Sequence, residues 1–101
     1  SINDKVVSGN LCVCKTASEL LHNYKPGDII VIEETNNEMM PQLRTASALI
    51  VEKGGISSHA AVVGMSLDIP VLLEAKSATE ILKQGSFVTV DSKKGIVYAN
   101  K

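Results

Sequence analysis

Three apolar runs, separated by short helical patterns, constrain most strongly how this chain can fold. They are "DIIVIEE" at 28–34, "SALIVEK" at 47–53 and "IPVLLEA" at 69–75. Each reads as a strand, and the second has the composition of a buried one. Because strands alternate with short helices here, the sequence predicts at least one βαβ unit with parallel strands.

The two ends of the chain carry a different pattern. "KVVSGNLCVCK" at 5–15 predicts two strands separated by a break at 8–10, and "SFVTVDSKKGIVYAN" at 86–100 predicts a hairpin around 92–95. Hairpins pair antiparallel. The predicted fold class is therefore α/β, with mixed parallel and antiparallel strands.

Helix signals fill the intervals between the predicted strands. Thr16 followed by Glu19 is a capping-box pattern that opens a short helix over 17–24. We expect the central helix at 58–67, where almost every residue is apolar, so that it is buried on most sides. Shorter helices are predicted within 36–46, where Pro41 is tolerable only near the helix start, and within 77–85.

Length and composition exclude several classes of function. The 101 residues predict a single domain, residues 1–101, with an aliphatic core, because aromatic residues make up 3% and Trp is absent. A net charge of -1 and few stacking side chains argue against a nucleic-acid partner. No apolar stretch approaches the roughly 18 residues that span a membrane, and no signal peptide is evident. We expect a cytoplasmic location.

The two cysteines and one of the two histidines are expected to be structural. Cys12 and Cys14 share one face of an extended segment and are predicted to be reduced, partly buried residues, with a metal or disulfide role as the alternative. His22 is predicted at the surface or end of the first helix. No metal site is predicted.

The second histidine lies in "GGISSHAAVV" at 54–63, which joins a strand to the central helix. Gly54 and Gly55 allow the backbone to approach a ligand closely. Ser57 or Ser58 is placed to cap the helix, and His59 follows in its first turn. A helix N-terminus with exposed N–H groups and hydroxyls suits an anion, especially phosphate.

The same position favours a neutral, nucleophilic imidazole, because the positive end of the helix dipole opposes the imidazolium. Donors around a transferring phosphoryl group are what phosphoryl transfer requires. A capping or packing role for His59 remains the alternative on these residues alone.

The stretch "GGISSHAAVVGMSLDIPV" at 54–71 resembles the swivelling phosphohistidine domain of phosphoenolpyruvate-utilising enzymes. That family includes pyruvate phosphate dikinase, phosphoenolpyruvate synthase and enzyme I of the sugar phosphotransferase system. The positions that match its signature are Gly54, Gly55, Ser58, His59, Ala60, Ala61, Ile69 and Pro70. The segments 27–43 and 88–98 also resemble the family's strand-and-turn and closing hairpin.

The resemblance implies a compact swivelling β/β/α fold in which His59 accepts a phosphoryl group. Gly54, Gly55, Ser57 and Ser58 would then contact phosphate. Phosphate, phosphoenolpyruvate or a nucleotide would be the ligand. The resemblance implies no cofactor in this domain and allows Mg²⁺ and K⁺ in a parent enzyme.

One departure from the family decides between two parents. Active transferases commonly carry Ala-Arg after the apolar run, where this chain has Gly64-Met65. This part resembles the extra C-terminal domain of some bacterial pyruvate kinases. We therefore expect a domain from the C-terminus of a larger enzyme, with a structural or regulatory role through the parent's other domains or subunits. The alternatives are a true phospho-carrier domain of a phosphoenolpyruvate synthase or pyruvate phosphate dikinase, and a free-standing small carrier.

Overall fold

The fold is built on one six-stranded sheet with strand order β4-β3-β2-β1-β5-β6. The computed structural model describes residues 5–55 and 57–99, so the remainder of the predicted 1–101 domain and the last residue of the predicted hairpin lie outside it. The strands are β1 (Val6–Val13), β2 (Ile29–Ile32), β3 (Ala48–Val51), β4 (Val71–Leu72), β5 (Phe87–Asp91) and β6 (Ile96–Ala99). Strands β1 to β4 are parallel, whereas β1, β5 and β6 pair antiparallel. The predicted mixed α/β class is confirmed.

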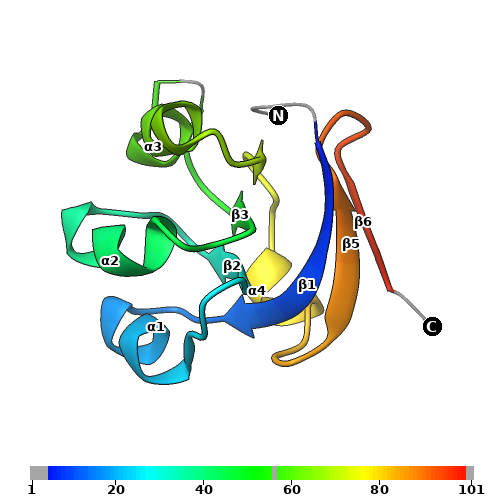
Figure 1. The fold of residues 1–101 in the computed structure, drawn as a ribbon, viewed down its shortest axis with the longest axis horizontal. Helices are drawn as coiled ribbons and strands as arrows, with labels where there is room; N and C mark the ends of the chain where they lie inside the picture. The colour runs from blue at the N-terminus through cyan, green and yellow to red at the C-terminus, as the bar shows by residue number, and fades with distance from the viewer. Residues whose placement is uncertain (1–4, 56, 100–101) are drawn as a thin grey trace.

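The helices are short and begin with side-chain caps at three places. They are α1 (Ala17–Asn23), the 3₁₀ turn η1 (Asn37–Met39), α2 (Met40–Leu43), α3 (His59–Leu67) and α4 (Ala78–Ile81). Thr16, Asn36 and Ser58 accept the capping hydrogen bonds of α1, η1 and α3. In Figure 1, α1, α2 and α3 lie on one side of the molecule, with β5 and β6 on the other. Within 5–55 and 57–99, no helix combines the length and apolar character needed to cross a membrane.

Two apolar cores bury both faces of the parallel strands. One core joins alternate strand residues to Leu20, Leu43 and Val63 of the three helices. The other lies between the remaining strand residues, Ala78 of α4 and the inward side chains of β5. Every residue of β2 and β3 is buried. This double burial explains why their sequences are continuous apolar runs rather than alternating ones.

The predicted break at residues 8–10 is wrong, because β1 continues through it. Residues 6–10 pair antiparallel with β5, and residues 11–13 pair parallel with β2. A Cβ on Gly9 would lie 3.1 Å from the carbonyl oxygen of Gly27, so the glycine allows β1 to pass close to the loop before β2. The polar residue Ser8 is accommodated by a 2.7 Å hydrogen bond between its Oγ and Thr89 Oγ1. In this strand the glycine and the polar residues therefore mark a place where two segments of the backbone approach closely, and they do not form a turn.

The two cysteines and His22, which the sequence predicts to be structural, lie in the core and at the surface of α1. Cys12 and Cys14 are free thiols in the helix-side core, and both are fully buried rather than partly so. Their mutual hydrogen bond lowers the pKa of Cys12, and the same bond together with burial raises that of Cys14. His22 is exposed in the last turn of α1, where its Nδ1 lies 2.8 Å from the carbonyl oxygen of Ser18.

Gly64 fixes how closely α3 packs against β4. It is buried, and a Cβ at this position would lie 2.2 Å from Cγ2 of Val71. Such a distance cannot be accommodated unless the Val71 side chain, the helix or the strand moves.

We therefore predict that Gly64→Ala destabilises the protein by about 1–3 kcal/mol, because the overpacking exceeds the gain in helix propensity. Urea denaturation measures the free energy of unfolding, with Ser66→Ala on the exposed side of α3 as the control. A Gly64→Ala variant as stable as the Ser66→Ala control would contradict this packing.

Candidate functional site

The site is built around the N-terminus of α3, which begins at His59. Ser58 has extended backbone angles, φ -71° and ψ 164°, and its Oγ accepts a hydrogen bond from the N–H of Ala61 at 3.3 Å. Of the two serines expected as the cap, Ser58 is therefore the cap. Ser57 is exposed in the turn before it.

Gly54 shapes the loop that leads into this cap. Its φ is +107°, in the region that favours glycine, and a Cβ would lie 2.8 Å from Cβ of Ser58. Gly55 is exposed, and a Cβ there would lie 3.8 Å from Glu74 Oε1, an ordinary contact. Of the two glycines, Gly54 is therefore the one whose backbone angle and close contact with Ser58 require a residue without a side chain.

Both ring nitrogens of His59 have partners. Nδ1 lies 2.7 Å from Thr35 Oγ1, and Nε2 lies 2.9 Å from Asn37 Oδ1. An amide oxygen only accepts, so Nε2 carries the hydrogen of this bond; in the neutral ring, Nδ1 then accepts from the Thr35 hydroxyl. Thr35 is buried whereas Asn37 is exposed. Nε2 is therefore on the accessible side of the ring.

Thr35 and Asn37 are functional candidates that the sequence reasoning missed. They follow β2, whereas His59 follows the loop after β3, and the two strands pair in parallel. The carboxyl ends of adjacent parallel strands meet at one edge of a sheet, where ligand sites in α/β folds commonly lie. The sequence did contain one signal for Thr35 and Asn37. They are polar and follow the predicted strand at 28–34, so this rule would have placed them at the edge of the sheet where a ligand binds.

A small cavity of about 90 Å³ lies beside the ring. It is lined by Gly54, Ser58 and His59 together with Glu34, Thr35, Lys53 and Ala60. Of the predicted phosphate contacts, Gly54 and Ser58 line this cavity, and Gly55 and Ser57 do not. Its volume is below the roughly 300 Å³ at which pockets for whole small molecules begin, so it suits a small group such as phosphoryl rather than a whole ligand.

The charges around this cavity nearly balance. Lys53 brings a cation to its lining, and Glu34 brings an anion. The Nζ of Lys53 lies 3.2 Å from Oε1 of Glu33, so a second carboxylate also interacts with this cation. Both of these side chains are about half exposed or more, and such a pair is weak. A dianionic phosphoryl group here would therefore meet one lysine cation that also interacts with carboxylates, together with the N–H groups at the start of α3.

Glu52 anchors the start of the glycine loop. Its Oε2 accepts hydrogen bonds from the hydroxyl of Thr79 at 2.6 Å and from the backbone N–H of Thr79 at 2.7 Å. These bonds, the side-chain one first, lower the pKa of Glu52. They connect the end of β3 to α4 and so limit how the loop before His59 can move.

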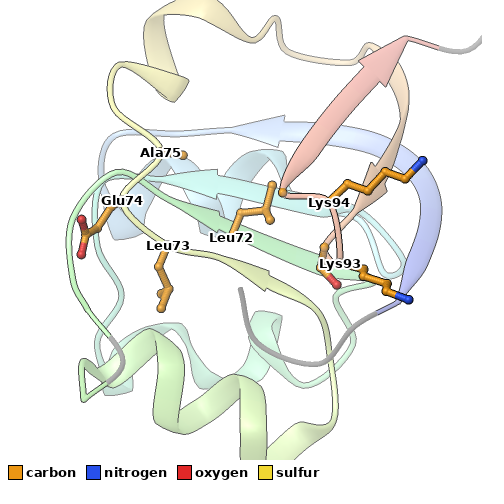
Figure 2. Close-up of a pocket in the computed structure, with 8 residues that line it drawn as sticks. Leu72, Leu73, Glu74, Ala75, Lys93 and Lys94 are labelled. Carbon is orange, nitrogen blue, oxygen red and sulfur yellow. The ribbon is translucent and has the colours of Figure 1, made fainter.

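A larger cavity lies elsewhere. It has a volume of about 420 Å³ and separates the loop after β4 from the β5–β6 turn (Figure 2). In this view Lys93 and Lys94 extend from the turn, while Glu74 points away from them on the other side. None of the predicted site residues lines this cavity. In the part of the chain that the structure describes, no three His, Cys, Asp or Glu side chains gather as metal ligands would.

The fold and the residues around His59 correspond to a known family of mobile domains. The family model described as "PEP-utilising enzyme, mobile domain" matches residues 24–95, which include the whole loop, cap and histidine. The chain belongs to this family, so the membership predicted from the sequence is confirmed.

Pyruvate kinases and phosphoenolpyruvate synthases are both similar to this chain over nearly its whole length. The pyruvate kinase of Bacillus licheniformis is 44% identical over 100 residues, which are 99% of this chain and 17% of the relative. A probable phosphoenolpyruvate synthase of Pyrococcus horikoshii is 44% identical over 91 residues, which are 90% of this chain and 11% of the relative. The chain thus spans only a small part of the curated relatives that it matches.

A solved structure supports the fold. An NMR structure of Enzyme I (nEIt) superimposes with a TM-score of 0.63 at 23% sequence identity, over 82% of this chain and 37% of that one. The predicted swivelling-domain fold is confirmed by this likeness.

The contact between Thr35 and His59 has a measurable consequence. We predict that Thr35→Val lowers the free energy of unfolding by about 1 kcal/mol, because the partly buried ring nitrogen of His59 loses its hydrogen-bond partner. Urea denaturation measures the effect. Thr35→Ser keeps the hydroxyl and is the matched control. A Val variant as stable as the wild type would show that the bond is not made.

The lowered pKa of Glu52 predicts that the stability of the fold depends on pH. Because its folded-state pKa is lowered, its carboxylate stabilises the fold fully above the unfolded value of about 4.3 and ceases to do so as pH falls through the folded value. Wild type is expected to be more stable than Glu52→Gln at pH 7, with a difference that shrinks towards pH 3. Urea denaturation at both pH values measures it, and a pH-independent difference would contradict the assignment.

Proposed function

We propose that this chain is the C-terminal domain of a pyruvate kinase and that its role there is structural or regulatory rather than phosphoryl transfer. The observation that carries the proposal is Met65, an exposed and uncharged side chain at the position where active transferases carry Arg. The similarity to pyruvate kinases over 96–99% of the chain supports this parent. We also propose a cytoplasmic location, no cofactor in this domain, and Mg²⁺ and K⁺ in the parent.

The hydrogen bonds of His59 support the same conclusion. To attack phosphorus, Nε2 needs a free lone pair, so the ring hydrogen has to reside on Nδ1. The contact with Asn37 Oδ1 instead holds the hydrogen on Nε2. Phosphorylation would require the proton to move to Nδ1 and the Asn37 amide to turn away. The position at which active transferases carry Arg is Met65, which is exposed and uncharged.

A phospho-carrier domain of a phosphoenolpyruvate synthase or pyruvate phosphate dikinase is the second candidate. The observation in its favour is the fixed ring, with its accessible Nε2 at a capped helix N-terminus. In that case phosphate would contact the loop Gly54–Gly55 and the hydroxyls of Ser57 and Ser58. The synthase relatives, 43–44% identical, are consistent with this candidate.

The kinetics of His59→Gln in the full-length polypeptide separate the two candidates. For a pyruvate kinase, kcat for pyruvate formation from phosphoenolpyruvate and ADP should stay within about twofold of the wild type, because no step passes through the histidine. A loss of about 10³-fold or more, as expected when a covalent nucleophile is removed, would contradict the proposal.

The matched control is His22→Gln, which changes the other histidine at an exposed helix end. Deletion of the domain from the parent adds a second readout. The proposal predicts that pyruvate formation persists while thermal stability or the response to effectors changes. Deletion that leaves both unchanged would contradict a structural or regulatory role.

A further inference from the structure

The two side chains that contact the imidazole of His59 differ in what they require of the ring. Thr35 Oγ1 lies 2.7 Å from Nδ1, and a hydroxyl is both a donor and an acceptor. It pairs with Nδ1 whether or not that nitrogen carries the ring hydrogen. Thr35 therefore holds the ring in place without selecting its tautomer.

Asn37 meets the nitrogen on the accessible side of the ring. Its Oδ1 lies 2.9 Å from Nε2, so in this arrangement Nε2 carries the hydrogen and has no free lone pair. When the amide turns over, its NH₂ group donates to the Nε2 lone pair instead, and Nδ1–H then donates to Thr35. Both orientations of the Asn37 amide therefore engage Nε2.

We propose that Asn37 is a positioning residue that keeps His59 unreactive, and that Nε2 accepts a phosphoryl group from a small donor once this side chain is removed. The inference rests on the proposed function, in which no phosphoryl group passes through the histidine. It goes further by naming the residue that restrains the ring and by treating the remainder of the site as competent.

The surroundings of the ring keep features that suit a phosphoryl group. The cavity of about 90 Å³ beside the ring is lined by Lys53 and Ser58 as well as by the ring itself. Ser58 caps α3, and the backbone N–H groups at the start of a helix favour an anion. None of these features depends on the Asn37 side chain, which does not line this cavity.

The place of Asn37 in the fold makes its contact with the ring separable from the local structure. Asn37 is exposed and is the first residue of η1. The cap of this turn is its neighbour Asn36, whose Oδ1 accepts a hydrogen bond from the N–H of Glu38 at 2.9 Å. Within the described part of the chain, the side chain of Asn37 makes its hydrogen bond with Nε2 alone. A substitution at Asn37 therefore changes the contact with the ring and keeps the cap of the turn.

Phosphoramidate is a phosphoryl donor small enough to probe the released nitrogen. The Nε2 lone pair forms a bond to phosphorus while the P–N bond of the donor breaks, and ammonia leaves with that electron pair. The ring hydrogen stays on Nδ1 and donates to Thr35 Oγ1. Because this donor needs no second protein domain, its rate of reaction measures the reactivity of the site itself.

Chemical phosphorylation of the full-length polypeptide tests the proposal. The polypeptide is treated with phosphoramidate, and the phosphorylated peptide that contains His59 is quantified by mass at neutral pH. We expect Asn37→Ala and Asn37→Leu to react at least about threefold faster than the wild type, because each loses the hydrogen bond to Nε2. Leucine is close to asparagine in shape, so Asn37→Leu separates the hydrogen bond from simple covering of the ring.

The matched control is Asn36→Ala, which removes the cap of η1 without touching the ring. It should be phosphorylated at the wild-type rate. Urea denaturation of each variant shows that the rates are compared between folded proteins.

Three results would overturn the proposal. The first is that both Asn37 variants react as slowly as the wild type. The second is that only Asn37→Ala reacts faster, which would mean that the side chain merely covers the ring. The third is that Asn36→Ala reacts as fast as the Asn37 variants, which would assign the effect to the turn. The kinetics of His59→Gln test the parent's reaction separately, so the two proposals can fail independently.

Discussion

The parallel pairing of β2 with β3 brings the carboxyl ends of two fully buried strands to one edge of the sheet. Thr35 and Asn37 follow the first strand, and the loop to His59 follows the second. Hydrogen bonds of 2.7 and 2.9 Å to the imidazole therefore join residues that are 24 and 22 positions apart in sequence. The orientation of His59 depends on this strand pairing as well as on the cap at Ser58.

Burial on both faces of the parallel strands has a second consequence. Helices α1 to α3 cover one face, and β5 with α4 covers the other. The strands β5 and β6 thus use one side to close a core, and their opposite side remains accessible. The histidine and this accessible side of β5 and β6 consequently belong to different parts of the fold.

Much of the fold could be predicted because its signals are local. The apolar runs identified β2 and β3, and a capping serine before an apolar segment identified α3. The continuity of β1 could not be predicted, since Gly9 is explained by the approach of Gly27, which adjoins it only in the folded chain. The site could be predicted only in part, because some of its contacts also form only in the folded chain. Local sequence indicates Gly54, Ser58 and His59, whereas Thr35 and Asn37 reach the ring through the sheet.

The central claim is that the chain keeps the architecture of a phosphohistidine site in a setting that does not favour a phosphorylated histidine. The uncharged Met65, a lysine shared with carboxylates and the hydrogen bond between Nε2 and Asn37 Oδ1 support it. The most direct test is the intact mass of the full-length polypeptide, quenched without acid during turnover with phosphoenolpyruvate. The account predicts no phosphoryl adduct. A stoichiometric, acid-labile adduct that disappears in His59→Gln would contradict it.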